Sequence, residues 1–206
     1  MLTFLAPSLA LGGITPFAHG ASRRISSLQA DPFTLGVASG DPTPDAVILW
    51  SRLDREVLKE AGHEDQAIQV DYEISESSNF QQIARSGSVV ASPELGHSVH
   101  ADIRGLDSDT TYFYRWHIGD ATSQTGRTKT APRASANKQE FRLAFASCQQ
   151  YEHGYFTAYQ HMAEENFDLI VHLGDYIYEK SWGSNLIRKH EGPEIQTLQD
   201  YRNRYI

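Results

Sequence analysis

The spacing of apolar residues changes once along this chain, and that change constrains the fold more than any other feature. From residue 31 to about residue 129, apolar and polar residues alternate. Beyond residue 138, apolar residues occur at helical spacing or in continuous runs. Alternation is typical of strands with one buried face, whereas the second pattern is typical of helices beside a fully buried sheet. The sequence therefore predicts two structural units of different class.

The first unit, residues 31–129, contains short strand-like runs separated by turn signals. These runs span residues 33–38, 47–51, 68–74, 88–91, 99–103 and 112–118. Turn-forming residues such as Gly40-Asp41-Pro42 lie between them, and no helix-period pattern intervenes. Short strands at this spacing favour an antiparallel β-sandwich of the immunoglobulin or fibronectin type.

A tyrosine near the end of this unit fits a known device of such sandwiches. Leu106 is followed six positions later by Tyr112, at the start of a predicted strand. In a tyrosine corner, the phenol hydroxyl bonds back to upstream backbone. An ordinary half-buried strand tyrosine explains the same spacing equally well, so both interpretations stay open.

The second unit, residues 139–206, follows a small, polar, Pro-containing linker at residues 130–138. The spacing predicts a strand over 141–146, a helix over 155–165 and a buried parallel strand over 169–173. This order makes a βαβ unit, which begins a three-layer α/β domain.

The carboxyl-terminal end contains a loop and a short helix. Residues 180–194 are more typical of a solvated loop than of a phosphate-steering segment, although Trp182, Arg188 and His190 lie there. Thr197 caps a helix whose apolar face is formed by Leu198, Tyr201 and Tyr205. We expect the arginines of this helix to face solvent.

Three side chains with metal-binding chemistry follow the two parallel strands. Cys148 follows the first strand, Asp175 follows the second after Gly174, and Tyr178 lies three residues further on. The carboxyl ends of parallel strands meet at one edge of the sheet, where ligands bind. Each residue alone has a simpler explanation, since Cys148 could be a buried thiol, Asp175 a cap and Tyr178 a packing residue. Their joint position favours a functional site.

The chemistry of these donors indicates which metal they would bind. A phenolate ligand needs a strong Lewis acid, because the pKa of tyrosine is about 10. Trivalent iron suits two oxyanions and a thiolate better than zinc, magnesium or calcium alone. A nucleophilic role for Cys148 is disfavoured, because Gly154 stands where a cysteine phosphatase needs arginine. The chain also has no nucleophile elbow and no Walker-type loop.

The amino-terminal 30 residues are typical of an export signal. Leu2 to Ala18 are mostly apolar but short and interrupted by Pro and Gly, so no stable membrane span is expected. Arg23-Arg24 follows this run, so we expect the basic leader to lie upstream of Met1; a plain tail is the alternative. The formal net charge of −8 argues against a nucleic-acid-binding module or bulk attraction to anionic lipid.

Several longer stretches of the chain carry a family resemblance. They are FTLGVASGDP (33–42), VILWSR (47–52), FASC (145–148), LGDYIYE (173–179), HEGPEI (190–195) and DYRNRY (200–205). These stretches resemble the PhoD-like alkaline phosphatase and phosphodiesterase family of the metallophosphoesterase superfamily. The resemblance covers nearly all of residues 31–206, and the combination of Ser147-Cys148 with the 174–179 run is specific.

This resemblance implies an exported hydrolase of phosphate esters, with a β-sandwich before a metallophosphoesterase domain that holds Fe³⁺ and Ca²⁺. By motif, Cys148 and Tyr178 would be iron ligands, and Asp175 would be the catalytic carboxylate bridging iron to calcium. The family further implies a secreted, periplasmic or cell-wall-associated monomer exported by the twin-arginine machinery.

One departure from the family pattern affects activity. An Asp-Asp-His-Glu type cluster is expected shortly after Tyr205, and it is absent from these 206 residues. We therefore expect an incomplete metallophosphoesterase domain over residues 139–206, with little or no activity from this chain alone. The alternative is a non-catalytic secreted β-sandwich binding module with a vestigial α/β segment.

Overall fold

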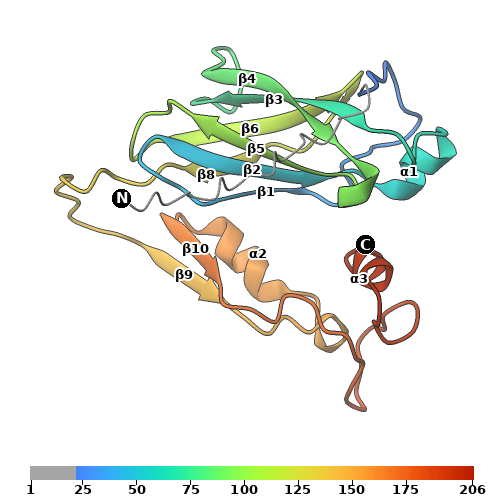
Figure 1. Ribbon diagram of the computed structural model, residues 1–206. Coiled ribbons are helices and arrows are strands. Elements are labelled where there is room, and N and C mark those ends of the chain that lie inside the picture. The colour runs from blue at the N-terminus through green and yellow to red at the C-terminus, as the bar shows by residue number, and fades with distance from the viewer. Residues whose placement is uncertain (1–21) are drawn as a thin grey trace, which may run out of the picture.

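The computed structural model describes residues 22–206, which form an upper all-β part and a lower α/β part (Figure 1). The upper part contains two antiparallel sheets. One has the strand order β1-β2-β5, and the other has the order β4-β3-β6-β7, with β8 also paired to β6. The strands are β1 (Val37–Gly40), β2 (Ala46–Arg52), β3 (Ile68–Ser75), β4 (Arg85–Ala91), β5 (Ser98–Arg104), β6 (Thr111–Ile118), β7 (Ala121–Thr122) and β8 (Gly126–Lys129).

The core of the upper part lies between the two sheets. Leu49 on β2 pairs with Ala101 on β5, while Ile74 on β3 pairs with Tyr114 on β6. All four belong to one buried cluster, because alternate side chains of each strand point to the same face. Each fully buried aliphatic or aromatic side chain stabilises the fold by roughly 1.5–3 kcal/mol. The prediction of an antiparallel, two-sheet arrangement is confirmed.

Short helical segments interrupt the strands, although no helix-period pattern marks them in the sequence. α1 (Arg55–Glu60) begins after Asp54, whose carboxylate accepts hydrogen bonds from the backbone N–H groups of Glu56 and Val57. α1 is only six residues long and buries only Leu58, so it produces no helical repeat in the sequence. η1 (Pro93–Leu95) is a single 3₁₀ turn.

The tyrosine-corner interpretation of Tyr112 agrees with the structure. The backbone N–H of Asp107 donates a hydrogen bond of 2.9 Å to the hydroxyl oxygen of Tyr112. The Tyr112 side chain is otherwise buried in the core. Burial also raises the pKa of this phenol, although the bond from Asp107 acts in the opposite direction. The hydroxyl thus fixes the turn that precedes β6.

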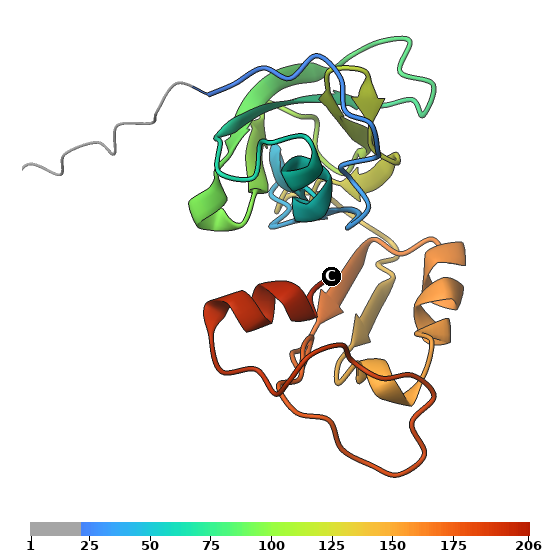
Figure 2. The ribbon, with the colours of Figure 1, turned by 90° about the vertical axis from the view of Figure 1, so that its right-hand side faces the viewer.

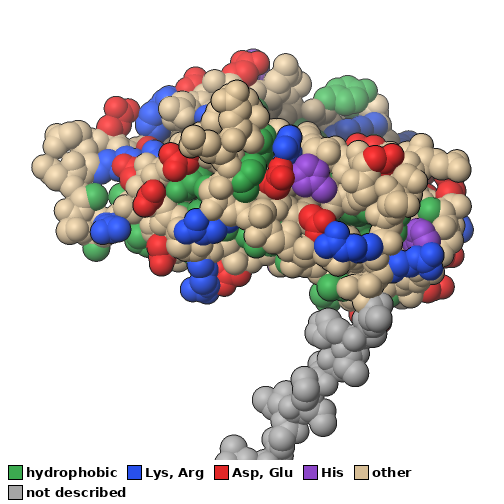
Figure 3. All heavy atoms as spheres, turned by 90° about the horizontal axis from the view of Figure 1, so that it is seen from above, with side chains coloured by type: hydrophobic (Ala, Val, Ile, Leu, Met, Phe, Trp, Pro, Cys, Tyr) green, Lys and Arg blue, Asp and Glu red, His purple; other side chains and the backbone are tan. Residues whose placement is uncertain are grey.

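The start of the described chain packs against the upper part. Arg23 forms an isolated parallel bridge with Ile68, and Ile25 is buried in the core. Most of the signal-like segment lies outside the described residues. The face of the upper part seen from above carries acidic and basic side chains interspersed (Figure 3). No helix in the part of the chain that the structure describes is long and apolar enough to cross a membrane.

The lower part is built on two parallel strands, as the sequence predicts, but the expectation of a buried strand over 169–173 is wrong. Ile170 and Leu173 are 52% and 63% exposed, because the two-stranded pair has too few elements packed on its faces to bury them. β9 (Leu143–Ala146) pairs with β10 (Leu169–His172), and α2 (Thr157–Glu164) connects them after the 3₁₀ turn η2 (Tyr151–His153). Figure 2 shows α2 on one side of the strand pair and α3 (Leu198–Arg204) on the other. α3 begins with the predicted cap, because Thr197 and Asp200 form a reciprocal capping box.

The two parts contact each other at opposite ends of the lower strand pair (Figure 1). Near the linker, Lys129 and Lys138 each form ion pairs with both Asp109 and Asp168, at 2.6–3.1 Å. We call these four residues the linker cluster. At the other end, α3 lies against β2 and η1 through Arg202, which donates a hydrogen bond to the Glu94 carbonyl.

The expectation that the arginines of α3 face solvent is wrong. Arg204 donates to the carbonyl oxygens of Tyr178 and Pro193, at 2.8 and 2.9 Å. Leu198, assigned to the apolar face, is exposed. The helical period predicts which residues share a face, but it does not show that backbone carbonyls on neighbouring elements are available as acceptors.

Candidate metal centre

The loops after β9 and β10 are joined by backbone hydrogen bonds. The N–H of Cys148 donates to the carbonyl of Gly174 at 3.1 Å, and the N–H of Gln149 donates to the carbonyl of Asp175 at 3.2 Å. Because β9 and β10 are parallel, their carboxyl ends lie at the same edge of the pair. The local fold therefore places the predicted donor residues side by side.

The side chains of Cys148, Asp175 and Tyr178 meet at one carboxylate oxygen. The Tyr178 hydroxyl donates to Asp175 Oδ2 at 3.0 Å, and the Cys148 thiol lies 3.5 Å from the same oxygen. Asp175 is thus at the centre of the group. All three predicted site residues are brought together.

The backbone at this site is strained. Cys148 and Asp175 have φ angles of 56° and 54°, in the left-handed region that non-glycine residues rarely adopt. Gly174, between β10 and Asp175, also has a positive φ of 114°. At the two non-glycine residues this conformation costs roughly 1–3 kcal/mol each and persists only where neighbouring contacts impose it. The two backbone bonds between the loops are such contacts.

The environment of Tyr178 favours its protonated form in the absence of a cation. Desolvation is the largest cause, followed by its hydrogen bonds with Asp175 and Cys148, and together they raise the pKa of the phenol above its usual value. The indole ring of Trp182 lies edge-on to the Tyr178 ring, with centroids 4.6 Å apart. Cys148 and Asp175 remain exposed, so the centre is accessible from solvent.

The donor set fits a trivalent cation better than a divalent one. Within residues 22–206, no group of three His, Cys, Asp or Glu side chains gathers as a metal site, so a third donor beside Cys148 and Asp175 would be the Tyr178 phenol. A thiol, a carboxylate and a phenol around one point match the preference of ferric iron. Zinc favours His and Cys, and calcium favours oxygen ligands alone.

Sequence reasoning missed a buried carboxylate that organises the neighbouring loop. Glu152 on η2 is 1% exposed and accepts hydrogen bonds from the Ser181 hydroxyl and from the His190 N–H at 3.2 Å. The hydrogen bond from Ser181 is the largest cause that lowers the pKa of Glu152. Residues 180–194 are therefore anchored around Glu152 rather than merely solvated. No local pattern marks Glu152, since its partners lie about 30–40 positions away.

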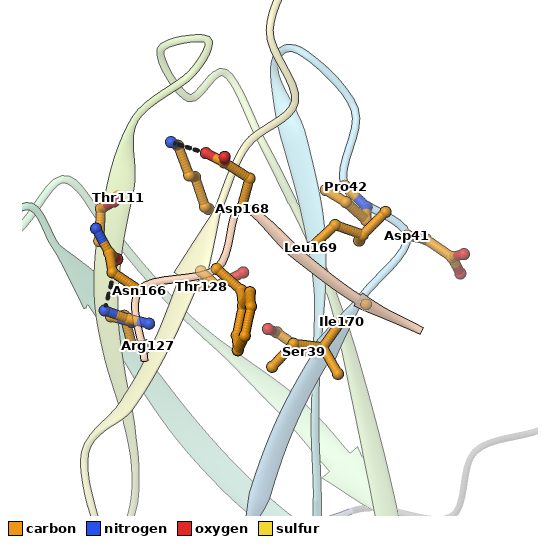
Figure 4. A pocket seen from close by; sticks show the side chains of 13 residues that line it. Ser39, Asp41, Pro42, Thr111, Arg127, Thr128, Asn166, Asp168, Leu169 and Ile170 are labelled. Atoms are coloured by element: carbon orange, nitrogen blue, oxygen red, sulfur yellow. Dashed lines mark hydrogen bonds and ion pairs between the residues drawn. The ribbon is translucent and has the colours of Figure 1, made fainter. Parts of the chain in front are cut away.

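A separate polar cleft lies between the two parts, near the linker cluster (Figure 4). It has a volume of about 270 Å³ and is lined by residues of β1, β8 and the start of β10. Arg127 donates to Asn166 at 3.2 Å across it, and Lys129 pairs with Asp168. The cleft borders the amino end of β10, whereas Asp175 follows its carboxyl end, so this cleft is not the candidate metal centre.

Comparisons with known proteins match both parts of the chain. Residues 19–132 match the family model "PhoD-like phosphatase, N-terminal domain", and residues 143–206 match the model "PhoD-like phosphatase". Over 181 residues, 84% of this chain, the sequence is 50% identical to alkaline phosphatase D of Bacillus subtilis (strain 168).

A solved structure of PhoD matches 87% of this chain with a TM-score of 0.80 and 49% sequence identity. The chain spans only 31% of the curated relative and 35% of the solved chain. Family models thus cover both the two-sheet part and the segment with Cys148, Asp175 and Tyr178. The chain belongs to the PhoD-like phosphatase family.

Proposed function

We propose that this chain is the amino-terminal part of an exported, metal-dependent hydrolase of phosphate esters. In this proposal Cys148 and Tyr178 bind Fe³⁺, and Asp175 is the catalytic carboxylate shared between Fe³⁺ and Ca²⁺. The single observation that carries the proposal is the convergence of the Cys148 thiol and the Tyr178 hydroxyl on Asp175 Oδ2. Family membership supports the reaction class.

The proposal assigns distinct roles to the residues of the centre. The parallel strands and the bonds between their loops present the three donors from one edge. The Tyr178 hydroxyl donates to Asp175 in the metal-free chain, so a cation bound by the phenolate would replace this proton and release it to solvent, while Asp175 would stay ionised. When bound, the metals supply a Lewis acid that activates the attacking oxygen and neutralises charge on the phosphoryl group.

The domain boundaries and the location complete the proposal. Residues 31–129 form a β-sandwich domain, residues 130–138 a linker, and residues 139–206 the start of a metallophosphoesterase domain. We infer a monomer that acts outside the cytoplasmic membrane after twin-arginine export. These features rest on family resemblance and on the apolar run at residues 2–18.

A ferric titration tests the metal assignment. Tyrosinate bound to ferric iron absorbs visible light, so the chain is expected to become coloured on addition of Fe³⁺. Tyr178→Phe is expected to abolish the band, because it removes the phenol but keeps the ring. Tyr155→Phe is the matched control, because Tyr155 is exposed, lies between η2 and α2 and is not part of the hydrogen-bonded group at Asp175. A colourless wild-type chain, or a band that survives Tyr178→Phe, would contradict the assignment.

An activity assay tests the expected incompleteness. Three donor residues cannot hold two metal ions in full coordination, so the 206-residue chain is expected to hydrolyse bis-p-nitrophenyl phosphate little or not at all. The measurement compares wild type with Asp175→Asn, both loaded with Fe³⁺ and Ca²⁺. Hydrolysis by the wild type that Asp175→Asn abolishes would show that this chain suffices. The same low background in both is the expected result.

A further inference from the structure

Two arginines bind across the boundary between the upper and lower parts. Arg52, on β2, donates from Nε to the carbonyl of Gly96 at 3.0 Å and from Nη1 to the carbonyl of Arg202 at 3.3 Å. Arg202, on α3, donates in the other direction to the carbonyl of Glu94. We call Arg52 and Arg202 the arginine clamp. Each arginine of the clamp thus binds the backbone of the opposite part.

Arg52 is unusually constrained for a charged residue. Arg52 is only 7% exposed, and its guanidinium forms no ion pair with a carboxylate among residues 22–206. The nearby Asp54 carboxylate already accepts hydrogen bonds from Thr34, Glu56 and Val57. A buried charge is costly unless hydrogen bonds satisfy it. The two carbonyls therefore fix where the guanidinium lies.

Aromatic rings connect this guanidinium to the loop after β10. Arg52 lies over the ring of Tyr205 at 5.7 Å, and Trp50 meets the same ring edge-on at 5.8 Å. Tyr205 in turn stacks on Tyr176, with centroids 6.1 Å apart and planes at 19°. Tyr176 directly follows Asp175 in the chain. A continuous set of contacts thus runs from β2 of the upper part to the central residue of the candidate metal centre.

We propose that Arg52 is a positioning residue, which acts through Tyr205 and Tyr176 to hold the 174–178 loop in place. The strained φ angles of Cys148 and Asp175 require contacts that prevent the loops from relaxing. The arginine clamp and the aromatic contacts provide them, and Arg52 and Trp50 do so from the upper part. The consequence for metal binding rests on the proposed function, whereas the consequence for loop order does not.

Arginine and lysine differ in a way that tests this role. The planar guanidinium can donate to two carbonyls in fixed directions while its face lies on an aromatic ring, whereas a lysine ammonium cannot reproduce that geometry. Arg52→Lys keeps the charge and removes the fork. Arg127→Lys is the matched control, because Arg127 also binds across the boundary but contacts Asn166 at the other end.

Hydrogen–deuterium exchange of the metal-free chain measures directly how well the 174–178 loop is held in place. The N–H groups of Cys148 and Gln149 donate to the carbonyls of Gly174 and Asp175, so their exchange reports whether the loop stays in place. Arg52→Lys is expected to accelerate exchange of these two amides at least threefold. Arg127→Lys is expected to leave it within the error of the measurement. Equal acceleration in both variants, or none in Arg52→Lys, would overturn the proposal.

A second variant distinguishes the proposed role of Arg52 from a folding defect caused by replacing this buried residue. Tyr205→Leu removes the stack on Tyr176 but leaves the hydrogen bonds of Arg52 intact, and it is expected to accelerate the same two amides. If neither Arg52→Lys nor Tyr205→Leu changes their exchange, Arg52 does not act through the rings. Circular dichroism of each variant verifies that the upper part remains folded.

The ferric titration separates this inference from the proposed function. If the wild type binds Fe³⁺, Arg52→Lys is expected to weaken the apparent affinity about tenfold while the absorption maximum stays in place, because the donors themselves are unchanged. If the wild type does not bind Fe³⁺, the proposed metal centre fails, and the exchange experiment alone decides the role of Arg52.

Discussion

The upper and lower parts of this chain use their apolar residues in opposite ways. Leu49 and Trp116 of the upper part are 0% exposed, whereas Phe145 and Leu173 of the lower part are 68% and 63% exposed. Apart from Ile83 and Leu95, the exposed large apolar residues among residues 22–206 all lie between residues 141 and 206. The upper part therefore contains the core, and the lower part contains the candidate chemistry. The chain separates the residues that stabilise it from the residues that would bind metal.

This difference in apolar burial indicates which contacts hold the strained loops after β9 and β10. The lower part has almost no buried apolar residues of its own, with Ile195 the exception among those described. Besides the backbone bonds to the loop of Cys148, the loop of Asp175 is held by Tyr176, which stacks on Tyr205, and Tyr205 contacts Arg52 and Trp50 of the upper part. A site on a weakly packed element thus depends on a well-packed neighbour, which the following predictions test.

Replacing one leucine in each part is the strongest test of the difference in apolar burial between the two parts. Leu49→Ala is expected to lower the free energy of unfolding by about 2–5 kcal/mol, because it leaves a cavity in the core. Leu143→Ala, on a strand of the lower part where the side chain is half exposed, is expected to cost less than about 1 kcal/mol. Urea unfolding followed by circular dichroism measures both. Equal costs would show that the lower part has a comparable core.

The linker cluster gives a smaller effect that depends on pH. The N–H of Arg142 and then the ammonium of Lys129 hold the pKa of Asp168 well below its usual range. Because the folded pKa is lower than the unfolded one, the carboxylate stabilises the fold above about pH 4, and this contribution is lost as the pH falls through the folded pKa. Asp168→Asn is expected to cost about 1–2 kcal/mol at neutral pH.

The pH dependence itself is the control for Asp168. Wild type and Asp168→Asn are compared by urea unfolding at neutral pH and again well below the unfolded pKa of aspartate. The difference in unfolding free energy is expected to shrink in acid, because below the unfolded pKa the unfolded chain binds a proton at this carboxyl before the folded chain does. A difference that stays constant with pH would mean that shape, and not charge, explains the cost.

The smallest effect concerns two phenol hydroxyls. Tyr112→Phe is expected to cost about 1 kcal/mol, because the N–H of Asp107 loses its acceptor at the tyrosine corner. Tyr201→Phe removes an exposed hydroxyl that donates to Glu179 in the lower part, and no measurable change is expected. Thermal unfolding of both variants provides the comparison. A larger loss for Tyr201→Phe would reverse the proposed division between the two parts.

Local patterns predicted the features that depend on local spacing. Ile68, Val70 and Ile74 are buried as their alternation indicates, since successive strand residues point to opposite faces. The meeting of Cys148 and Asp175 followed from the parallel order of two strands. α1 was missed, because one buried residue, Leu58, is too little for a helical pattern.

The contacts that support the candidate site could not be predicted in the same way. Arg52 and Arg202 are 150 positions apart, and nothing in the spacing of either segment connects them. Trp50 and Arg52 entered the sequence argument only as part of a family-like stretch, with no role attached. Long-range hydrogen bonds to backbone carbonyls leave no pattern in the sequence, because every residue offers the same carbonyl acceptor whatever its side chain.

The two contact regions between the parts also limit how they can move. A rigid body attached at one point can turn about three axes, whereas one attached at two separated points can only rock about the line that joins them. The linker cluster and the arginine clamp are two such points, at opposite ends of the lower strand pair. The loop of Asp175 is joined to the clamp through Tyr176 and Tyr205, so it lies beside one of these two points. Rocking between the parts therefore displaces the loop that lies lowest in Figure 2, farthest from the upper part, more than the residues beside the clamp.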